Sequence, residues 1–175
     1  MKIYFIFLML LLTQESMNDN KFELFLGRNI DELKIEAENK IHNVDNNRHS
    51  YFFFDAPLVY LNNSIHVMFF TVDGDEKISE IDIKLTSLVD KSFYDDLVNL
   101  YGEPESIMVS DGVIYEKEID GITEQNATVR KTINKVRQGK FDENPTFIIW
   151  KKQNFEIELL MKYSQNKSEI TFKKR

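Results

Sequence analysis

The sequence contains no cysteine, which excludes disulfides, zinc–thiolate and iron–sulfur sites, a cysteine nucleophile and the lipid-modified cysteine of a lipoprotein. With six glycines and three prolines it has neither a glycine-rich phosphate loop nor a GxSxG motif. Metal chemistry would have to rest on His42, His49 and His66, and their spacing matches no metal-binding pattern. We therefore expect no catalytic residues, no metal and no cofactor.

The composition is that of a folded, acidic protein. The 175 residues carry a formal net charge of -7, 42% of them are hydrophobic, and 14 are phenylalanine. Such a chain is long enough to bury a real core as one domain. Its negative charge disfavours nonspecific binding to nucleic acid, so we expect no nucleic-acid partner.

The first residues have the pattern of an export signal. Lys2 precedes a continuous apolar run from Ile3 to Leu12, which is too short to span a bilayer as a mature helix. We interpret residues 1–17 as a signal peptide and expect cleavage between residues 13 and 20, with a periplasmic or extracellular location. The alternative is an uncleaved interfacial anchor, because the cleavage region lacks a clean small-x-small site.

In the first half of the chain, apolar residues at helical spacing predict a helix from about Asn29 to Asn43. An aromatic segment follows, and then a hairpin that turns at Asp73-Gly74. Alternation in its first strand assigns Ile65, Val67 and Phe69 to the face that the helices cover.

The hairpin SIHVMFFTVDGDEKISEIDIKL, residues 64–85, has an echo in NFEIELLMKYSQNKSEITFKKR, residues 154–175. The two align at an offset of 90 residues before the turn and 89 after it. A helix at about 88–101, ended by Gly102 and Pro104, and an apolar strand precede the second hairpin. The sequence therefore predicts an α+β fold of two helix-plus-three-strand repeats, 18–87 and 88–175, with the helices packed on one face of an antiparallel sheet. Alternatively, the two hairpins match only because alternation makes amphipathic strands similar.

This element order, carried by FYDDLVNLYGEP and the terminal strands, resembles the tandem α/β exported domains of the β-lactamase-inhibitor-protein type and the related outer-membrane assembly lipoprotein BamE. The resemblance implies the fold rather than an activity, and the cysteine of the lipoprotein is absent.

Residues 107–145 form an insertion in the second repeat. We predict a hairpin turning at Asp111-Gly112 and a short helix from about Asn126 to Gln138. This helix would carry the basic residues Arg130, Lys131 and Lys135. They either pair with the acidic residues that precede them or face an anionic partner or lipid surface. Membrane contact is expected only through this helix or an uncleaved leader.

In the first hairpin, His66, Met68 and Phe70 fall on the sheet face opposite the helices, where an apolar surface must be covered by the insertion, the leader or another molecule. Together with Arg130, Lys131 and Lys135 they are the candidate partner-binding residues. The expected function is an exported, non-enzymatic module that binds a protein, as an inhibitor, immunity or envelope-assembly protein. The alternatives are a small carboxylate-based hydrolase and a purely structural envelope protein.

Overall fold

The computed structural model describes residues 21–33, 40–43, 48–53, 59–120 and 128–175. Most of them form strands, which are β1 (Lys40–Asn43), β2 (Arg48–Phe53), β3 (Val59–Tyr60), β4 (Asn63–Val72), β5 (Ile78–Leu85), β6 (Ser106–Asp120), β7 (Thr128–Gln138), β8 (Pro145–Lys151), β9 (Phe155–Lys162) and β10 (Lys167–Lys174). The helical segments are α2 (Lys91–Tyr101) and the 3₁₀ turns η1 (Phe22–Phe25), η2 (Ile30–Leu33), η4 (Phe141–Glu143) and η5 (Tyr163–Gln165).

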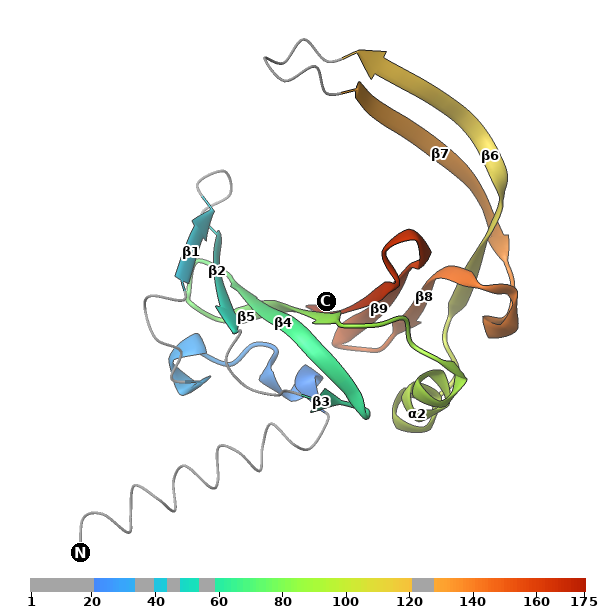
Figure 1. The fold of residues 1–175 in the computed structure, drawn as a ribbon. Helices are drawn as coiled ribbons and strands as arrows, with labels where there is room; N and C mark the ends of the chain where they lie inside the picture. The colour runs from blue at the N-terminus through green and yellow to red at the C-terminus, as the bar shows by residue number, and fades with distance from the viewer. Residues whose placement is uncertain (1–20, 34–39, 44–47, 54–58, 121–127) are drawn as a thin grey trace, which may run out of the picture.

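The strands form one antiparallel sheet in the order β1-β2-β4-β5-β10-β9-β8-β6-β7, with the short β3 paired to β4. The sheet is curved, and the turn η1 and the helix α2 lie on its convex side (Figure 1). On the other side, the outer parts of β6 and β7 rise away from the sheet and arch over it (Figure 1).

The predicted α+β arrangement of two helix-plus-three-strand repeats is wrong. Among the described residues, α2 is the only α-helix, and it precedes five strands of the second half. The first half has no matching α-helix within its described residues, and its strands β1 and β2 extend the sheet beyond β4. The predicted signal peptide lies outside the described residues.

The helix predicted from Asn29 to Asn43 is replaced by η2 and β1, with residues 34–39 outside the described residues. Backbone hydrogen bonds explain why the start of this segment does not form the predicted helix. The Gly27 N–H donates to the Ile78 carbonyl at 2.7 Å, and the Ile30 N–H donates to the Glu76 carbonyl at 3.0 Å. These hydrogen bonds fix the segment along the beginning of β5. Tertiary pairing thus overrides a helical spacing of apolar residues.

The helix predicted from Asn126 to Gln138 is the strand β7, paired antiparallel with β6 from Asp120↔Thr128 to Met108↔Gln138. Apolar residues at Val129, Ile133 and Val136 fit a helical spacing, but these residues are β-branched, and such residues favour strands. Asp111-Gly112, expected as a turn, lies within β6 where the register shifts between Ser110 and Val113. This irregularity is a β-bulge, and Gly112 takes a φ of 103° that favours glycine.

The helix predicted at about 88–101 is confirmed as α2. The Asp90 side chain accepts a hydrogen bond from the Phe93 N–H at 3.0 Å, and Gly102 ends the helix with a φ of 73°. Phe93, Leu97 and Tyr101 are buried, whereas Leu100 has 41% of its surface exposed.

The hydrophobic core lies between α2, η1, η2 and one face of the sheet. Trp150 of β8 is fully buried, and its indole N–H donates to the Gly102 carbonyl at 2.9 Å. Ser168 is the buried polar residue of this core, and its hydroxyl accepts a hydrogen bond from the Val89 N–H at 3.1 Å. These contacts tie both ends of α2 to the sheet.

The two similar hairpins lie side by side at the centre of the sheet, because β5 pairs with β10. A constant offset of 89 residues relates their buried residues: Met68 to Ile157, Phe70 to Leu159, Val72 to Met161, Ile81 to Ile170 and Ile83 to Phe172. The sequence alignment at an offset of 90 in the first strand is therefore wrong by one residue.

A second β-bulge explains that error. Ile65 pairs with Leu85 and Val67 pairs with Lys84, so His66 is an extra residue in β4. An extra residue switches the side chains that follow to the opposite face. Ile65 packs against the core, and after the bulge Met68 and Phe70 are the core residues, with 0% and 2% of their surface exposed.

Tyr60 sits in an aromatic cluster with Phe22, Phe93 and Phe172, at ring-centroid distances of 5.2, 5.8 and 6.1 Å. Its hydroxyl is buried and meets no hydrogen-bond partner among the described residues; burial raises its pKa, and the nearby Tyr101 hydroxyl acts in the opposite direction. The neighbouring Tyr101 hydroxyl instead donates to Glu23 Oε2 at 2.6 Å.

We expect Tyr60→Phe to leave the free energy of unfolding unchanged or to raise it by up to about 1 kcal/mol, because it removes a polar atom that is buried without a partner. Tyr101→Phe is the matched variant and should lower it by about 1 kcal/mol, because Glu23 loses its hydrogen bond. Urea unfolding of the two variants measures this difference. Equal losses would show that the Tyr60 hydroxyl has a bonding role.

In the part of the chain that the structure describes, no helix has both the length and the apolar character needed to cross a membrane.

Candidate functional site

The face of the sheet opposite α2, named the open face here, presents its side chains in rows that run across the strands. The middle row crosses six paired strands and consists of Phe52, Phe69, Asp82, Thr171, Glu158 and Ile149. A neighbouring row consists of Val67, Lys84, Glu169, Leu160, Phe147 and Met108. Both rows carry charged residues at the centre and apolar residues at both ends.

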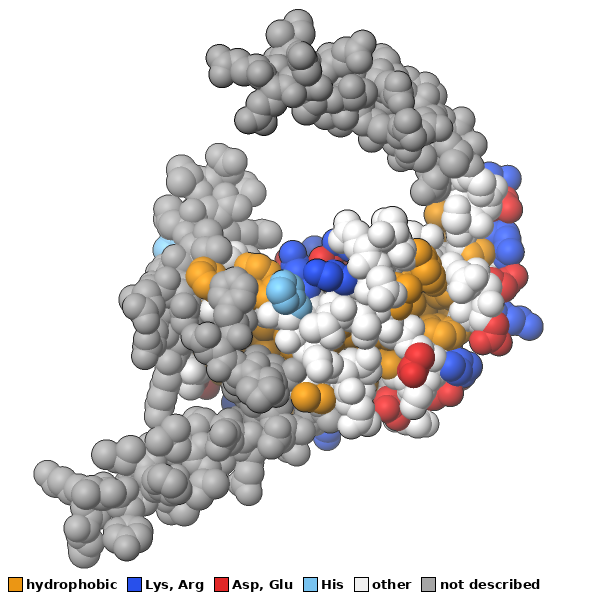
Figure 2. Space-filling view, viewed as in Figure 1, with side chains coloured by type: hydrophobic (Ala, Val, Ile, Leu, Met, Phe, Trp, Pro, Cys, Tyr) orange, Lys and Arg blue, Asp and Glu red, His pale blue; other side chains and the backbone are white. Residues whose placement is uncertain are grey.

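Most residues of the apolar ends are partly exposed, whereas Val67 is buried, with 4% of its surface exposed. Phe52 and Phe69 pack with ring centroids 6.5 Å apart, and Lys84 Nζ lies 5.2 Å from the centre of the Phe69 ring. On the other side Leu160 and Ile149 are half-buried. Hydrophobic side chains gather on both sides of a charged centre in the space-filling view (Figure 2). The open face thus offers two apolar contact areas with a polar strip between them.

The charged centre contains ion pairs between β5 and β10 and between β9 and β10. Glu169 Oε1 lies 2.7 Å from Lys162 Nζ and 3.7 Å from Lys84 Nζ, and Glu80 Oε2 lies 3.4 Å from Lys173 Nζ. These pairs are partly exposed, so each contributes little to stability. They occupy the lysines of the strip and two of its carboxylates.

Asp82 differs from these carboxylates. Its Oδ1 accepts a hydrogen bond from the Thr171 hydroxyl at 2.6 Å, and among the described residues no cation forms an ion pair with it. Burial raises the pKa of Asp82, and the nearby negative charges of Glu80 and Glu169 raise it further, while the Thr171 hydrogen bond acts in the opposite direction. The folded protein thus holds a carboxylate whose charged form is disfavoured.

The structure separates the residues predicted to bind a partner. Met68 and Phe70 are in the core under α2, so the expectation that they line the open face is wrong. His66 is exposed at the bulge in β4. Met68 and Phe70 belong to the core cluster that includes residues of α2 and η1, and Ile107 and Phe141 of the insertion pack against this cluster.

The basic residues lie in β7. In the backbone register Arg130 stands opposite Glu118, and Lys131 stands opposite Lys117. Lys135 Nζ lies 3.2 Å from Asp111 Oδ2. Pairing with the preceding acidic residues Glu116, Glu118, Asp120 and Glu124 was one interpretation of this basic cluster. The partner of Lys135 is instead Asp111, which was not among them.

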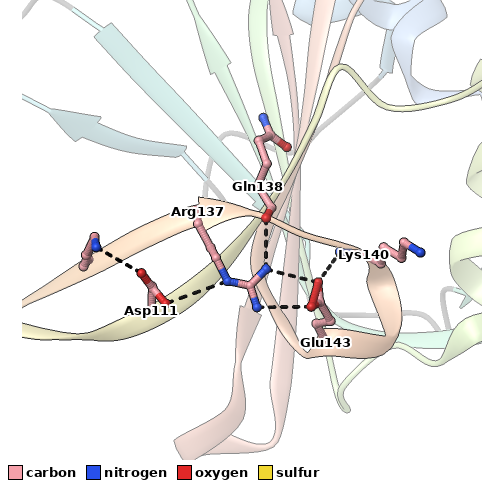
Figure 3. A network of polar contacts seen from close by, with 6 residues as sticks. Asp111, Arg137, Gln138, Lys140 and Glu143 are labelled. Atoms are coloured by element: carbon pink, nitrogen blue, oxygen red, sulfur yellow. Dashed lines mark hydrogen bonds and ion pairs between the residues drawn. The ribbon is translucent and has the colours of Figure 1, made fainter.

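Arg137 connects the base of the β6–β7 hairpin to η4. Its guanidinium donates to both carboxylate oxygens of Glu143, at 3.1 and 3.3 Å, and lies 3.8 Å from Asp111 (Figure 3). The Glu143 carboxylate also accepts the Lys140 N–H at 2.9 Å. Arg137 and this N–H lower the pKa of Glu143. The bidentate geometry fixes the point at which the hairpin leaves the sheet.

The histidines show one arrangement that the spacing did not reveal, since His42 and His49 stand opposite each other in the β1–β2 register. Within the described residues, no three histidine or carboxylate side chains come together in a way that could hold a metal ion.

Sequence reasoning missed Asp82 and Phe69. The signal for Asp82 was present, because Ile81, Ile83 and Leu85 alternate toward the core and leave Glu80 and Asp82 on the other face. Phe69 was assigned to the covered face because the bulge at His66 is not visible in the pattern of alternation.

No family model matches this chain, and the searches of curated proteins and of solved structures gave no match either.

Proposed function

We propose that the protein is a binding module that holds a protein partner on the open face, and that the partner places a lysine or arginine next to Asp82. The observation that supports this most strongly is the partly buried Asp82 carboxylate without a cation partner among the described residues, placed between two apolar areas. The resemblance-based expectation of an inhibitor, immunity or assembly protein belongs to this same class of function.

The physical argument concerns the charge of Asp82. Folding desolvates its carboxylate beside Glu80 and Glu169, which costs free energy in the absence of a partner. A cation from a partner would relieve this cost, because an opposite charge at close range favours the ionised carboxylate. Phe69 and Leu160 would supply the apolar contact on either side, where desolvation contributes most of the affinity.

The open face favours binding over catalysis. Two pockets lie around η1, α2 and the β8–β9 turn, and Asp82 lines neither of them. A broad surface with partly exposed aromatic residues suits a macromolecule, whereas a hydrolase would need a cleft that encloses its substrate. With the apolar leader, this supports a protein that binds its partner after export.

The experiment compares Asp82→Asn with the wild type in two measurements. In quantitative capture from an extract of exported proteins, the variant should lose the partner, because an amide cannot replace the negative charge. In urea unfolding at pH 7 the same variant should be more stable than the wild type. The raised pKa means that ionised Asp82 destabilises the folded state above that pKa, so this advantage should disappear as the pH falls through the normal carboxyl range.

Asp142→Asn is the matched control, since Asp142 is exposed on η4, away from the open face. It should leave both capture and stability unchanged. If Asp82→Asn captured the same proteins as the wild type with equal affinity, the open face would not be the binding surface.

A further inference from the structure

A separate surface of the protein combines exposed leucines with basic side chains. Two adjoining pockets of about 510 and 620 Å³ lie where η1 meets the end of α2 and the β8–β9 turn. They share Glu23, Leu24, Asn154 and Phe155 and are wide and open rather than enclosed. We name this surface the basic groove.

The charge of the basic groove opposes that of the whole chain. Lys21 and Lys152 line one pocket, and Arg28 and Lys174 line the other, within a protein of net charge -7. Arg175 adjoins them, because its guanidinium donates to the Lys152 carbonyl at 3.1 Å.

Two carboxylates offset part of this positive charge. Glu23 lies within the groove and accepts the hydrogen bond of the Tyr101 hydroxyl at 2.6 Å. At the edge, the pKa of Asp73 is lowered mainly by the Lys77 backbone N–H and to a smaller extent by Lys174. The basic residues of the groove outnumber these carboxylates, so its net charge is positive.

The apolar residues of the groove are unusually exposed. Leu24 of η1 has 54% of its surface exposed, and Leu100 of α2 has 41%. Their neighbours in the same elements, Phe25 and Leu97, are buried. Two exposed leucines from adjacent elements therefore lie among basic side chains. This combination is typical of a surface that inserts into the interface of a lipid bilayer.

We propose that the basic groove binds the surface of a membrane that contains anionic lipids, with Leu24 and Leu100 inserted among the acyl chains and Lys21, Arg28, Lys152 and Lys174 next to the phosphates. This inference does not depend on the function proposed for the open face. It places membrane contact at a different part of the chain from the expectation drawn from the sequence, which named the leader and the basic segment at 126–138.

The position of the groove in the chain supports a membrane rather than an acidic peptide. Lys21, which lines the groove, follows the apolar run Ile3–Leu12 by a short polar stretch. If that run acts in export or as an anchor, it would bring this end of the molecule to a bilayer. The open shape also fits a flat surface, whereas no enclosed channel is present in these pockets to hold a single acyl chain.

The test uses the protein recovered from the exporting host, with its N-terminus determined by mass spectrometry. Sedimentation with vesicles of phosphatidylcholine plus about 30 mol% phosphatidylglycerol should show binding that falls with salt and is absent on pure phosphatidylcholine. Lys152→Gln with Lys174→Gln should weaken it roughly 30-fold, since each basic residue near such a surface contributes about 1 kcal/mol. Leu24→Ser with Leu100→Ser should weaken it about tenfold, because two half-exposed leucines no longer insert.

The matched control is Lys140→Gln with Lys167→Gln, which removes two exposed lysines at the opposite end of β8–β10. This control should bind vesicles as the wild type does. Equal binding by all variants, or binding without phosphatidylglycerol, would refute the proposal. A different result would also refute it: no vesicle binding, together with NMR shifts of the groove residues on adding inorganic phosphate or a glutamate-rich peptide. The groove would then bind a soluble anion.

Discussion

Replacing Phe70 with alanine should lower the free energy of unfolding by about 3–5 kcal/mol, which is the usual cost of removing a buried aromatic ring. Phe70 has 2% of its surface exposed and belongs to the core beneath α2. Truncation leaves a cavity between β4 and the helical segments that the surrounding side chains fill only in part. Urea unfolding measured at equilibrium gives this free energy directly.

Phe69→Ala is the decisive comparison, because it removes the same ring from the adjacent residue on the other face. Phe69 is only half-buried, so this change should cost about 1 kcal/mol. A larger loss for Phe69 than for Phe70 would mean that β4 lacks the bulge at His66. Comparing the two variants therefore shows which of Phe69 and Phe70 faces the core.

Leu97→Ala and Ile157→Ala should each lower the free energy of unfolding by about 2–4 kcal/mol. Leu97 is the buried centre of α2, Ile157 lies in β9, and both have 0% of their surface exposed. Each truncation opens a cavity at the contact between the helix and the sheet. Thermal or urea unfolding of the two single variants would test this expectation.

Glu158→Ala, one residue after Ile157, serves as the control. Glu158 is exposed on the open face, so its loss should change stability by about 0.5 kcal/mol or less. If Glu158→Ala were as costly as Ile157→Ala, the assignment of faces in β9 would be inverted.

The parts of the fold that could be predicted are those in which one local signal is unambiguous. In β9, Ile157, Leu159 and Met161 alternate without interruption, and all three are buried as expected. In α2, an aspartate before the helix and a glycine after it mark both ends. Alternation and capping act over a few residues, so a single sequence contains the information they need.

Other parts depend on pairing partners far away in the chain. At His66 one extra residue reverses the faces of β4, and this bulge is defined only by the pairing with β5. The segment of β7 has apolar residues at helical spacing, but its long register with β6 determines the structure. Long-range pairing of this kind overrides local preference.

The candidate site could be predicted only in part. Alternation in β5 places Glu80 and Asp82 on the same face, opposite Ile81 and Ile83. What singles out Asp82 is its position in the middle of the sheet, next to Thr171 from the second half of the chain. The nearby lysines form their ion pairs with Glu80 and Glu169 instead. That neighbourhood exists only after the two hairpins have paired.

The central place of β10 also affects when the chain can fold. Ile81 pairs with Phe172, and Ile83 with Ile170, so the middle of the sheet joins residues of the first half to the last strand. Contacts between such distant segments slow folding. Until β10 has been synthesised, β5 and β9 both lack the strand that lies between them. The β4–β5 hairpin therefore cannot complete its side of the core while only the first half of the sheet has left the ribosome.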